Sequence, residues 1–215
     1  MTGAEFGADG LARALARTVR GEVRFDQFSR VLYSTDASIY QVLPVGVVVP
    51  RDADDIAATL RLCADAGVPV LPRGAGTSLA GQSVGRAVVL DCSKYMDRIL
   101  EIDPGAGQAR VQPGVVQDVL NGALVPHGFR LGPDTATSNR ATLGGMIGNN
   151  SCGARSIVYG KMVDHVRTLH VLMSDGMEIT LGPLDEDSLA AKRAEPSREG
   201  QLYRTVLDTA ETHRD

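Results

Sequence analysis

Two long stretches of glycine and small polar residues set the main limit on what this chain can fold into. The first, PRGAGTSLAG, covers residues 72–81, and the second covers residues 132–153. Neither stretch carries enough apolar surface to build much of a core, because burial of apolar side chains is the main favourable term in folding. The segments around them therefore have to supply the core, and the stretches themselves become candidates for binding a ligand.

Apolar and β-branched runs outside these stretches alternate between strand and helix patterns. Val45–Val49 predicts a buried strand, Asp52 is placed to cap a helix that ends at Gly67, and Val68–Leu71 predicts a second, parallel strand. The other expected elements are a helix over 8–20, a strand over 87–90, a hairpin of 98–102 with 108–112 across a turn at 103–107, a helix over 115–125, a second hairpin of 166–174 with 177–181, and a helix over 201–212.

This order of elements predicts an α+β fold with two lobes, 40–95 and 97–185. An N-terminal helical lead-in precedes them over 1–39, and a linker with the start of a helix follows over 186–215. Because the chain ends inside that helical pattern, we expect it to be a fragment of a longer polypeptide. Helical and strand spacing also predicts which side chains pack inward: Leu11, Leu15 and Val19; Val116, Val119, Leu120 and Leu124; and His170 in its strand.

Composition narrows the possible partners and compartments. The net charge of −4 gives no basic surface for nucleic acid, and no apolar run approaches the roughly 20 residues that cross a bilayer. The cysteines Cys63, Cys92 and Cys152 are odd in number and widely spaced, which favours a reducing compartment without disulfides. No C-x-x-C pair exists to hold zinc or an iron–sulfur cluster in this chain. We therefore expect a cytoplasmic protein without a metal site of its own.

The first stretch has the composition of a loop that binds a phosphate. Alternate glycines allow positive φ angles and a close approach of the backbone, while Thr77 and Ser78 add hydroxyl donors to a row of N–H groups. A Walker A loop would need a closing G-K-[ST], and a Rossmann fingerprint would need a glycine where Leu79 stands. A diphosphate is the natural ligand for such a loop, and a flexible surface loop is the alternative that the residues alone leave open.

The second stretch differs from a disordered linker in one respect. Leu143, Met146 and Ile147 recur at helical spacing and predict a short helix that starts near Gly144, with N-terminal amides free for an anion. Small residues around that helix would let a flat ligand lie against the backbone. A glycine-rich packing turn is the alternative.

Together these motifs resemble a known family. The first stretch, the run GPDxxTSNRATLGGMIGNNSCGARS and the later YGKMVDHV resemble the FAD-linked oxidases of the vanillyl-alcohol oxidase / p-cresol methylhydroxylase (PCMH) superfamily. The resemblance covers residues 25–185 and is greatest to D-lactate, glycolate and D-2-hydroxyglutarate dehydrogenases. It implies a PCMH-type FAD-binding domain of two α/β subdomains, which oxidises a 2-hydroxy acid to the 2-oxo acid together with a substrate domain.

The resemblance also assigns residues to the cofactor. Those expected to bind FAD are Pro72, Arg73, Gly74, Ala75, Gly76, Thr77, Ser78, Gly81, Gln82, Ser83, Pro133, Asp134, Thr142, Leu143, Gly144, Gly145, Gly148, Asn149, Asn150, Ser151, Cys152, Gly153, Tyr159, Gly160 and Val166. Some members attach the flavin to a histidine of the first stretch; Thr77 and Ser78 stand there, so the resemblance implies non-covalent FAD. Ala75 is a departure, since many relatives have glycine at that position.

No residue of this chain is expected to be catalytic. The resemblance places the substrate domain, the 2-hydroxy-acid site and any iron–sulfur cluster beyond Asp215, in a longer protein that would be peripheral to the membrane. His165, beside Asp164, is the one histidine near the expected flavin, and a structural role is favoured for it. The alternatives are a non-catalytic module that binds FAD or another nucleotide diphosphate, and another oxidoreductase of the superfamily, such as a sugar-nucleotide reductase or an aldonolactone oxidase. The particular hydroxy acid, the electron acceptor and the oligomeric state are not determined by the sequence.

Overall fold

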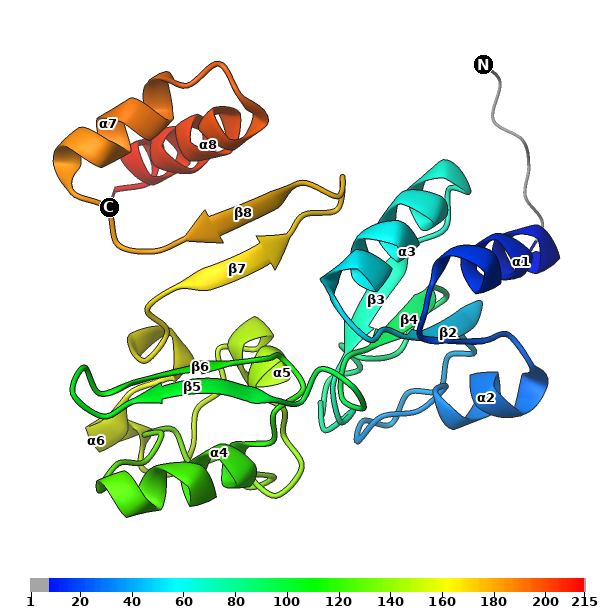
Figure 1. Ribbon diagram of the computed structural model, residues 1–215, viewed down its shortest axis with the longest axis horizontal. Helices are drawn as coiled ribbons and strands as arrows, with labels where there is room; N and C mark the ends of the chain where they lie inside the picture. Colours follow the sequence, from blue (N-terminus) through cyan, green and yellow to red (C-terminus); the bar gives the residue numbers. More distant parts are fainter. Residues whose placement is uncertain (1–7, 215) are drawn as a thin grey trace. The chain divides into compact units, whose positions relative to one another are not determined.

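The computed structural model describes residues 8–214, which form two compact units (Figure 1). The first unit holds residues 8–166 and 174–176, and the second holds residues 167–173 and 177–214. All residues expected to bind the cofactor lie in the first unit.

A four-stranded sheet forms one half of the first unit. Its strands are β1 (Glu22–Arg24), β2 (Gly46–Val49), β4 (Val88–Asp91) and β3 (Val70–Arg73), in that spatial order. β2 and β3 both run parallel to β4, which lies between them, whereas β1 is antiparallel to β2. The predicted parallel strand–helix–strand unit is confirmed, with one strand between its two ends.

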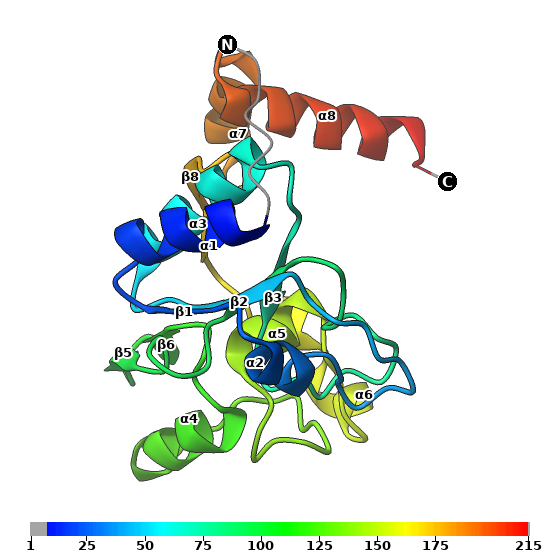
Figure 2. The same cartoon turned by 90° about the vertical axis from the view of Figure 1, so that its right-hand side faces the viewer.

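Both faces of this sheet are buried. On one face, α1 (Ala8–Thr18) and α3 (Ala53–Asp65) place Leu11, Leu15 and Cys63 against the sheet residues Val48, Val88 and Leu90. On the other face, Val47, Val49 and Val89 form a smaller cluster with tyrosine and leucine side chains. Figures 1 and 2 show α1 and α3 on one side of the sheet and α2 (Gln27–Leu32) on the other. A strand buried on both faces reads as an uninterrupted apolar run, which is why Val45–Val49 predicts it.

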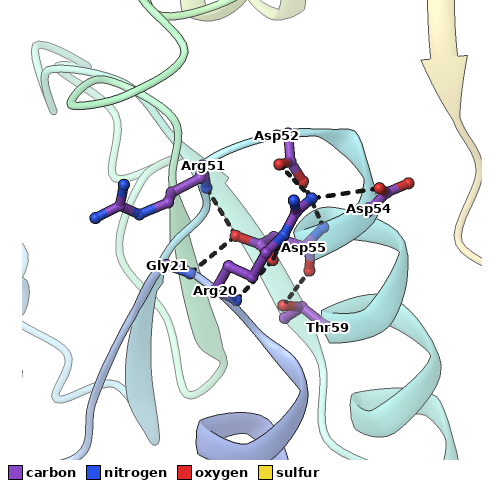
Figure 3. Close-up of polar contacts among 7 residues, drawn as sticks. All are labelled: Arg20, Gly21, Arg51, Asp52, Asp54, Asp55 and Thr59. Carbon is purple, nitrogen blue, oxygen red and sulfur yellow. Dashed lines mark hydrogen bonds and ion pairs between the residues drawn. The ribbon is translucent and has the colours of Figure 1, made fainter.

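A buried carboxylate fixes the start of α3 to the sheet (Figure 3). Asp55 is 2% exposed, and its two oxygens accept backbone N–H groups from Arg20, Gly21 and Arg51 at 2.8–2.9 Å. Asp52 caps the helix by accepting the N–H of Asp55 at 3.2 Å, as the sequence predicts. The same residue holds the guanidinium of Arg20 at 2.5 Å. The loops before β1 and after β2 are thereby attached to one helix end.

The other half of the first unit contains a hairpin and several short helices. The elements are β5 (Ile99–Asp103), β6 (Gln108–Val111), α4 (Gln117–Leu124), the 3₁₀ turn η1 (Val125–His127), α5 (Leu143–Gly148), α6 (Ser156–Tyr159) and the 3₁₀ turn η2 (Met162–Asp164). β5 and β6 pair antiparallel across the predicted turn, where Gly107 has a φ of +62°. Val115, Leu120, Leu143, Met146 and Met162 form the core beneath them.

The inward face of α4 differs from the prediction. Val119 is 57% exposed, whereas Gln117 is fully buried. Val116 has an extended backbone, so the helix begins at Gln117, and residues 117, 120 and 124 share its inner face. The expectation that Val116 and Val119 pack as helical core residues is therefore wrong, while Leu120 and Leu124 are buried as predicted.

The second unit contains β7 (Leu169–Leu172), β8 (Glu178–Leu181), α7 (Glu186–Ala194) and α8 (Arg198–Thr212). β7 and β8 form the predicted antiparallel hairpin. His170 is exposed in this hairpin and lies 3.0 Å from Glu178, so the expectation that it is packed is wrong. Among residues 8–214, no helix is both long and apolar enough to cross a membrane, and no group of side chains is arranged to hold a metal ion.

Candidate functional site

The first glycine-rich stretch is a loop that leaves β3 and returns toward β4. Within the described part of the chain, no backbone N–H from Gly74 to Gln82 donates a hydrogen bond. Gly76 and Gly81 have φ angles of +68° and +79°, whereas Gly74 does not have a positive φ. A row of uncommitted N–H groups in such a turn is the arrangement that binds phosphate oxygens.

Side chains at both ends of this loop fix its shape. The guanidinium of Arg73 donates to the carbonyl oxygens of Tyr33, Thr35 and Ser83 at 2.8–3.2 Å. Ser83 donates its hydroxyl to Asp36 at 2.9 Å. Burial of Asp36 works against its ionisation, but hydrogen bonds from Ser38 and Ser83 outweigh it and lower the pKa of the carboxyl. Within the loop, the hydroxyl of Ser78 contacts the amide oxygen of Gln82.

The two glycine-rich stretches meet at Gly74 and Thr142. A Cβ on Gly74 would overlap the Oγ1 atom of Thr142 and would lie 3.2 Å from its Cβ. Gly74 is therefore required for space, and the expectation that it needs a positive φ is wrong. Sixty-eight positions separate these residues in the chain, so only the fold brings the stretches together.

The hydroxyl of Thr142 is open at this junction. Thr142 precedes α5 but does not cap it, and its hydroxyl has no hydrogen-bond partner among residues 8–214. No buried side-chain oxygen or nitrogen in that range lacks a partner, so this hydroxyl oxygen reaches the surface although the residue is only 4% exposed. The side chain at the meeting point of the two stretches thus retains a free donor and acceptor.

The short helix predicted in the second stretch is confirmed as α5, but its first amides are occupied. The N–H groups of Leu143 and Gly144 donate to the carbonyl oxygens of Val115 and Pro113, both at 2.8 Å. The expectation of free amides at this helix end is wrong for these two residues. The side chain of Leu143 is also in the core, 3% exposed. Gly145 lies beside Thr142, and Gly148 has open space around it.

A residue that sequence reasoning missed holds the start of the second stretch. The buried amide of Gln117 donates to the carbonyl of Pro133 and accepts the hydroxyl of Thr135 at 2.7 Å. Next to it, Asp134 binds Arg155 at 2.6 Å, and this contact is the main reason why the pKa of Asp134 is lowered. No local pattern marks Gln117 for this role; once it is buried, its amide needs the hydrogen-bond partners that Pro133 and Thr135 supply.

The remaining expected residues follow α5 and are tied to η2. The N–H of Met162 donates to Ser151 O, and the N–H of Val163 donates to Asn150 Oδ1, each at 3.0 Å. Asn150 has a φ of +46°, a conformation that asparagine tolerates better than most residues. Gly153 packs against the backbone of Asp134, where a Cβ would overlap the carbonyl oxygen. Cys152 is exposed, and Val166 packs at the edge of the core.

His165 has a structural environment. Its Nε2 atom lies 2.6 Å from the carbonyl oxygen of Tyr159, and its ring packs against Gly132. Gly160, with a φ of +71°, turns the chain between Tyr159 and η2. These contacts tie the exposed ring to the neighbouring backbone, and the structural role that the sequence favours for His165 stays a prediction.

Comparison with known families agrees with this geometry. The profile of the family described as FAD binding domain matches residues 44–182. The chain belongs to this family. The predicted PCMH-type α+β fold is confirmed by solved structures: alkyldihydroxyacetonephosphate synthase has a TM-score of 0.69, with 22% identity over 80% of this chain and 34% of that one. For 6-hydroxy-D-nicotine oxidase from Arthrobacter nicotinovorans the TM-score is 0.67, with 20% identity over 76% of this chain and 36% of that one.

Curated relatives of this FAD-binding domain are considerably longer. D-2-hydroxyglutarate dehydrogenase of Pseudomonas putida is 42% identical over 196 residues, which are 90% of this chain and 20% of the relative. The Escherichia coli protein of the same name is 39% identical over 90% of this chain and 19% of its own length. Glycolate oxidase subunit GlcD of Bacillus subtilis is 38% identical over 76% of this chain and 36% of its own length. The chain thus spans about a fifth of the dehydrogenases that it matches.

The residues of this FAD-binding domain fit the cofactor named by the family. FAD carries a diphosphate between its two nucleoside-like halves, and the loop from Gly74 to Gln82 offers uncommitted N–H groups for it. Thr142 adds a free hydroxyl where the two stretches meet. FAD is therefore the cofactor of the domain.

Proposed function

We propose that this chain is the FAD-binding part of a flavin-dependent 2-hydroxy-acid dehydrogenase and that it holds FAD without a covalent bond. The contact of Gly74 with Thr142 carries the proposal, because it brings a row of free N–H groups beside a free hydroxyl. The relatives named D-2-hydroxyglutarate dehydrogenase and glycolate oxidase support the substrate class.

In this proposal each stretch has its own part of the cofactor. The loop from Pro72 to Ser83 holds the diphosphate through the uncommitted N–H groups of residues 74–82. Residues 133–134 and 142–145 lie along the diphosphate and the ribityl chain, and 148–153 with Tyr159 and Gly160 lie near the ribityl chain and ring. The backbone at Val166 faces the adenine side. Thr77 and Ser78 offer no nitrogen that could link to the flavin, which is why the attachment is non-covalent.

In this proposal the chain itself binds FAD and orients it. When bound, FAD supplies the acceptor for the hydride that leaves the α-carbon of the hydroxy acid. A base and a cationic site for the substrate carboxylate are needed as well. Arg155 is engaged with Asp134, and His165 is held by Tyr159, so neither is available for these tasks. We therefore place substrate binding and proton removal in the rest of a longer protein, together with transfer of electrons to an acceptor. We also propose a reducing compartment, the cytoplasm, for that protein; the three cysteines without a disulfide, Cys63, Cys92 and Cys152, support this part of the proposal.

Binding of FAD is the first experiment. The purified chain, titrated with FAD and followed by flavin fluorescence, should saturate at one equivalent. Gly76→Ala should weaken binding by at least about tenfold, because alanine resists a φ of +68° and its Cβ would lie 2.9 Å from Arg73 Cζ. Gly122→Ala is the matched control, since Gly122 lies in α4 with open space around it and an ordinary φ. Equal FAD affinity in both folded variants would show that the loop from Gly74 to Gln82 does not bind FAD.

A test of the substrate class requires the polypeptide that is expressed from the complete reading frame. Its flavin should bleach without oxygen on addition of one enantiomer of a 2-hydroxy acid among lactate, malate and 2-hydroxyglutarate, or on addition of glycolate. Bleaching by none of them would refute the dehydrogenase part of the proposal and leave FAD binding intact.

A further inference from the structure

We propose that Arg73 is a positioning residue, which holds the first loop in the shape that accepts the diphosphate of FAD. This inference rests on the proposed function and deepens it. It changes the role expected for Arg73 from a cofactor contact to the internal support of the loop.

The guanidinium closes the loop by joining its two ends. Arg73 is the last residue of β3, directly before Gly74, and its Nη1 atom donates to the carbonyl of Ser83 at 3.0 Å. Residues 74–83 therefore form a ring that is closed by one side chain. The same nitrogen donates to Tyr33 O at 3.2 Å, and Nη2 donates to Thr35 O at 2.8 Å. A planar guanidinium with five N–H donors in fixed directions is suited to binding several carbonyls at once.

The middle of the loop packs on the same group. A Cβ on Gly76 would overlap Nη2 of Arg73 and would lie 3.2 Å from Nε, so the backbone of Gly76 rests directly against the guanidinium. The carbonyl of Gly76 is also held from outside, because it accepts the N–H of Ala37 at 3.0 Å. The segment of Ala37 follows Thr35, which Arg73 itself binds. The loop is thus fixed at its start, middle and end by one side chain and the segment that this side chain anchors.

The support is itself held rigid by the sheet. The guanidinium carbon of Arg73 lies 5.4 Å from the centre of the Tyr33 ring, and the Tyr33 hydroxyl donates to Asp91 at 2.6 Å. Asp91 is 7% exposed and stands opposite Arg73 in the register of β3 and β4. Burial of Tyr33, together with its bond to this carboxylate, raises the pKa of the phenol, so Tyr33 stays protonated and keeps the bond. The position of the guanidinium is therefore set before any ligand arrives.

The test uses variants of the full chain that separate support from charge. Arg73→Met keeps an unbranched, mainly apolar side chain of about the length of the arginine stem and removes the donors, while Arg73→Lys keeps the charge and removes the planar fork. Arg51→Met is the matched control, because Arg51 also stacks on a tyrosine, with its guanidinium carbon 4.8 Å from the centre of the Tyr95 ring, but does not touch the loop. Dissociation constants are measured for FAD, for ADP, which carries the diphosphate and the adenosine half without the flavin, and for riboflavin, which carries the ring and the ribityl chain without phosphate.

We expect Arg73→Met to weaken FAD and ADP by at least about tenfold and riboflavin by less than about twofold. Arg73→Lys should restore only a small part of that loss, and Arg51→Met should bind all three ligands as the unaltered chain does. Without ligand, hydrogen exchange at the Ala37 amide should be faster in Arg73→Met, since its acceptor in the loop is released.

Three results would overturn the inference. Full affinity in Arg73→Lys would mean that charge acts on the diphosphate directly. Equal losses for riboflavin and FAD would mean general destabilisation, and unchanged affinity in Arg73→Met would mean that the loop needs no support. Failure of the unaltered chain to bind FAD refutes the proposed function instead, and the exchange rate at Ala37 then still reports whether Arg73 orders the loop.

Discussion

Adding one methyl group at Gly74 should disturb both the stability of the domain and its cofactor site. In Gly74→Ala the new Cβ would overlap Thr142 Oγ1 and would lie 3.2 Å and 3.4 Å from Thr142 Cβ and Cγ2. Relief requires the two atoms to move apart by roughly 1.5 Å, because non-bonded heavy atoms are in favourable contact only near 3.5 Å. Thr142 is 4% exposed and β-branched, so the side chain cannot simply turn away.

The expected size of the effect follows from overpacking. Inserting one methyl group into a closely packed contact lowers the free energy of unfolding by about 1–3 kcal/mol. Removing the obstacle should recover most of this, so the double variant Gly74→Ala/Thr142→Ala should be more stable than the sum of the single effects predicts. The coupling energy should be about 1–2 kcal/mol, within the range for residues in direct contact.

Urea unfolding of the four proteins in the cycle measures this coupling, and FAD titration of the same proteins measures the site. The FAD affinity of Gly74→Ala should fall by at least about tenfold, and part of it should return in the double variant, which lacks the Thr142 hydroxyl. Strictly additive free energies of unfolding would refute the contact between the two stretches. Normal FAD affinity in a destabilised Gly74→Ala variant would instead show that the contact between Gly74 and Thr142 stabilises the domain but does not shape the FAD site.

Four further outcomes are expected. Acid precipitation of the FAD-loaded chain should leave all flavin in the supernatant; flavin that stays on the denatured protein would contradict non-covalent binding. The FAD-loaded chain alone should not be bleached rapidly and stereospecifically by any 2-hydroxy acid in anaerobic stopped-flow, since the groups that hold the substrate are placed elsewhere. Gln117→Met should lower the free energy of unfolding by about 1–3 kcal/mol in urea titrations, because the carbonyl of Pro133 loses its donor; an unchanged value would mean that water replaces the amide. Hydrogen bonds from Lys94 and Tyr95 lower the pKa of Glu22 from 4.5 to about 2, so its stabilising contribution is complete above pH 4.5 and is lost as the pH falls toward 2; Glu22→Gln should therefore flatten the fall of stability in that window, as measured by thermal unfolding.

Local signals were sufficient for most of the elements. Val45–Val49, the cap at Asp52 and the two hairpins predict β2, α3, β5–β6 and β7–β8 because each depends on neighbouring residues only. The sequence did not predict α2, because the apolar side chains of this helix do not mark an inner face; Phe28, for example, is 73% exposed. β1 is three residues long and exists as a strand through its pairing with β2, which no local pattern encodes.

For the candidate site too, some features could be predicted from neighbouring residues and others depend on residues that are distant in sequence. The glycines of the first stretch indicate a phosphate-binding loop through composition alone. That Gly74 needs space and not a positive φ depends on Thr142, which is distant in sequence. The buried position of Gln117 could not be predicted, since apolar Val119 is the better core residue by type. Its place follows from where α4 begins, and that point is set by the extended backbone at Val116.

The carboxylate of Asp55 has a consequence for which substitutions the first unit tolerates. Its hydrogen-bond donors at positions 20 and 51 are main-chain N–H groups, so any residue except proline can stand there without loss of these bonds; the ion pair of the Arg20 side chain with Asp55, at 4.0 Å, is the contact with this carboxylate that depends on the side chain at position 20. Gly21 is more restricted, because a Cβ would overlap the carbonyl of Val49. A library randomised at these positions should therefore accept almost everything at 20 and 51, only glycine at 21, and only aspartate at 55. The three main-chain hydrogen bonds that join the two loops to the helix all end on one acidic side chain.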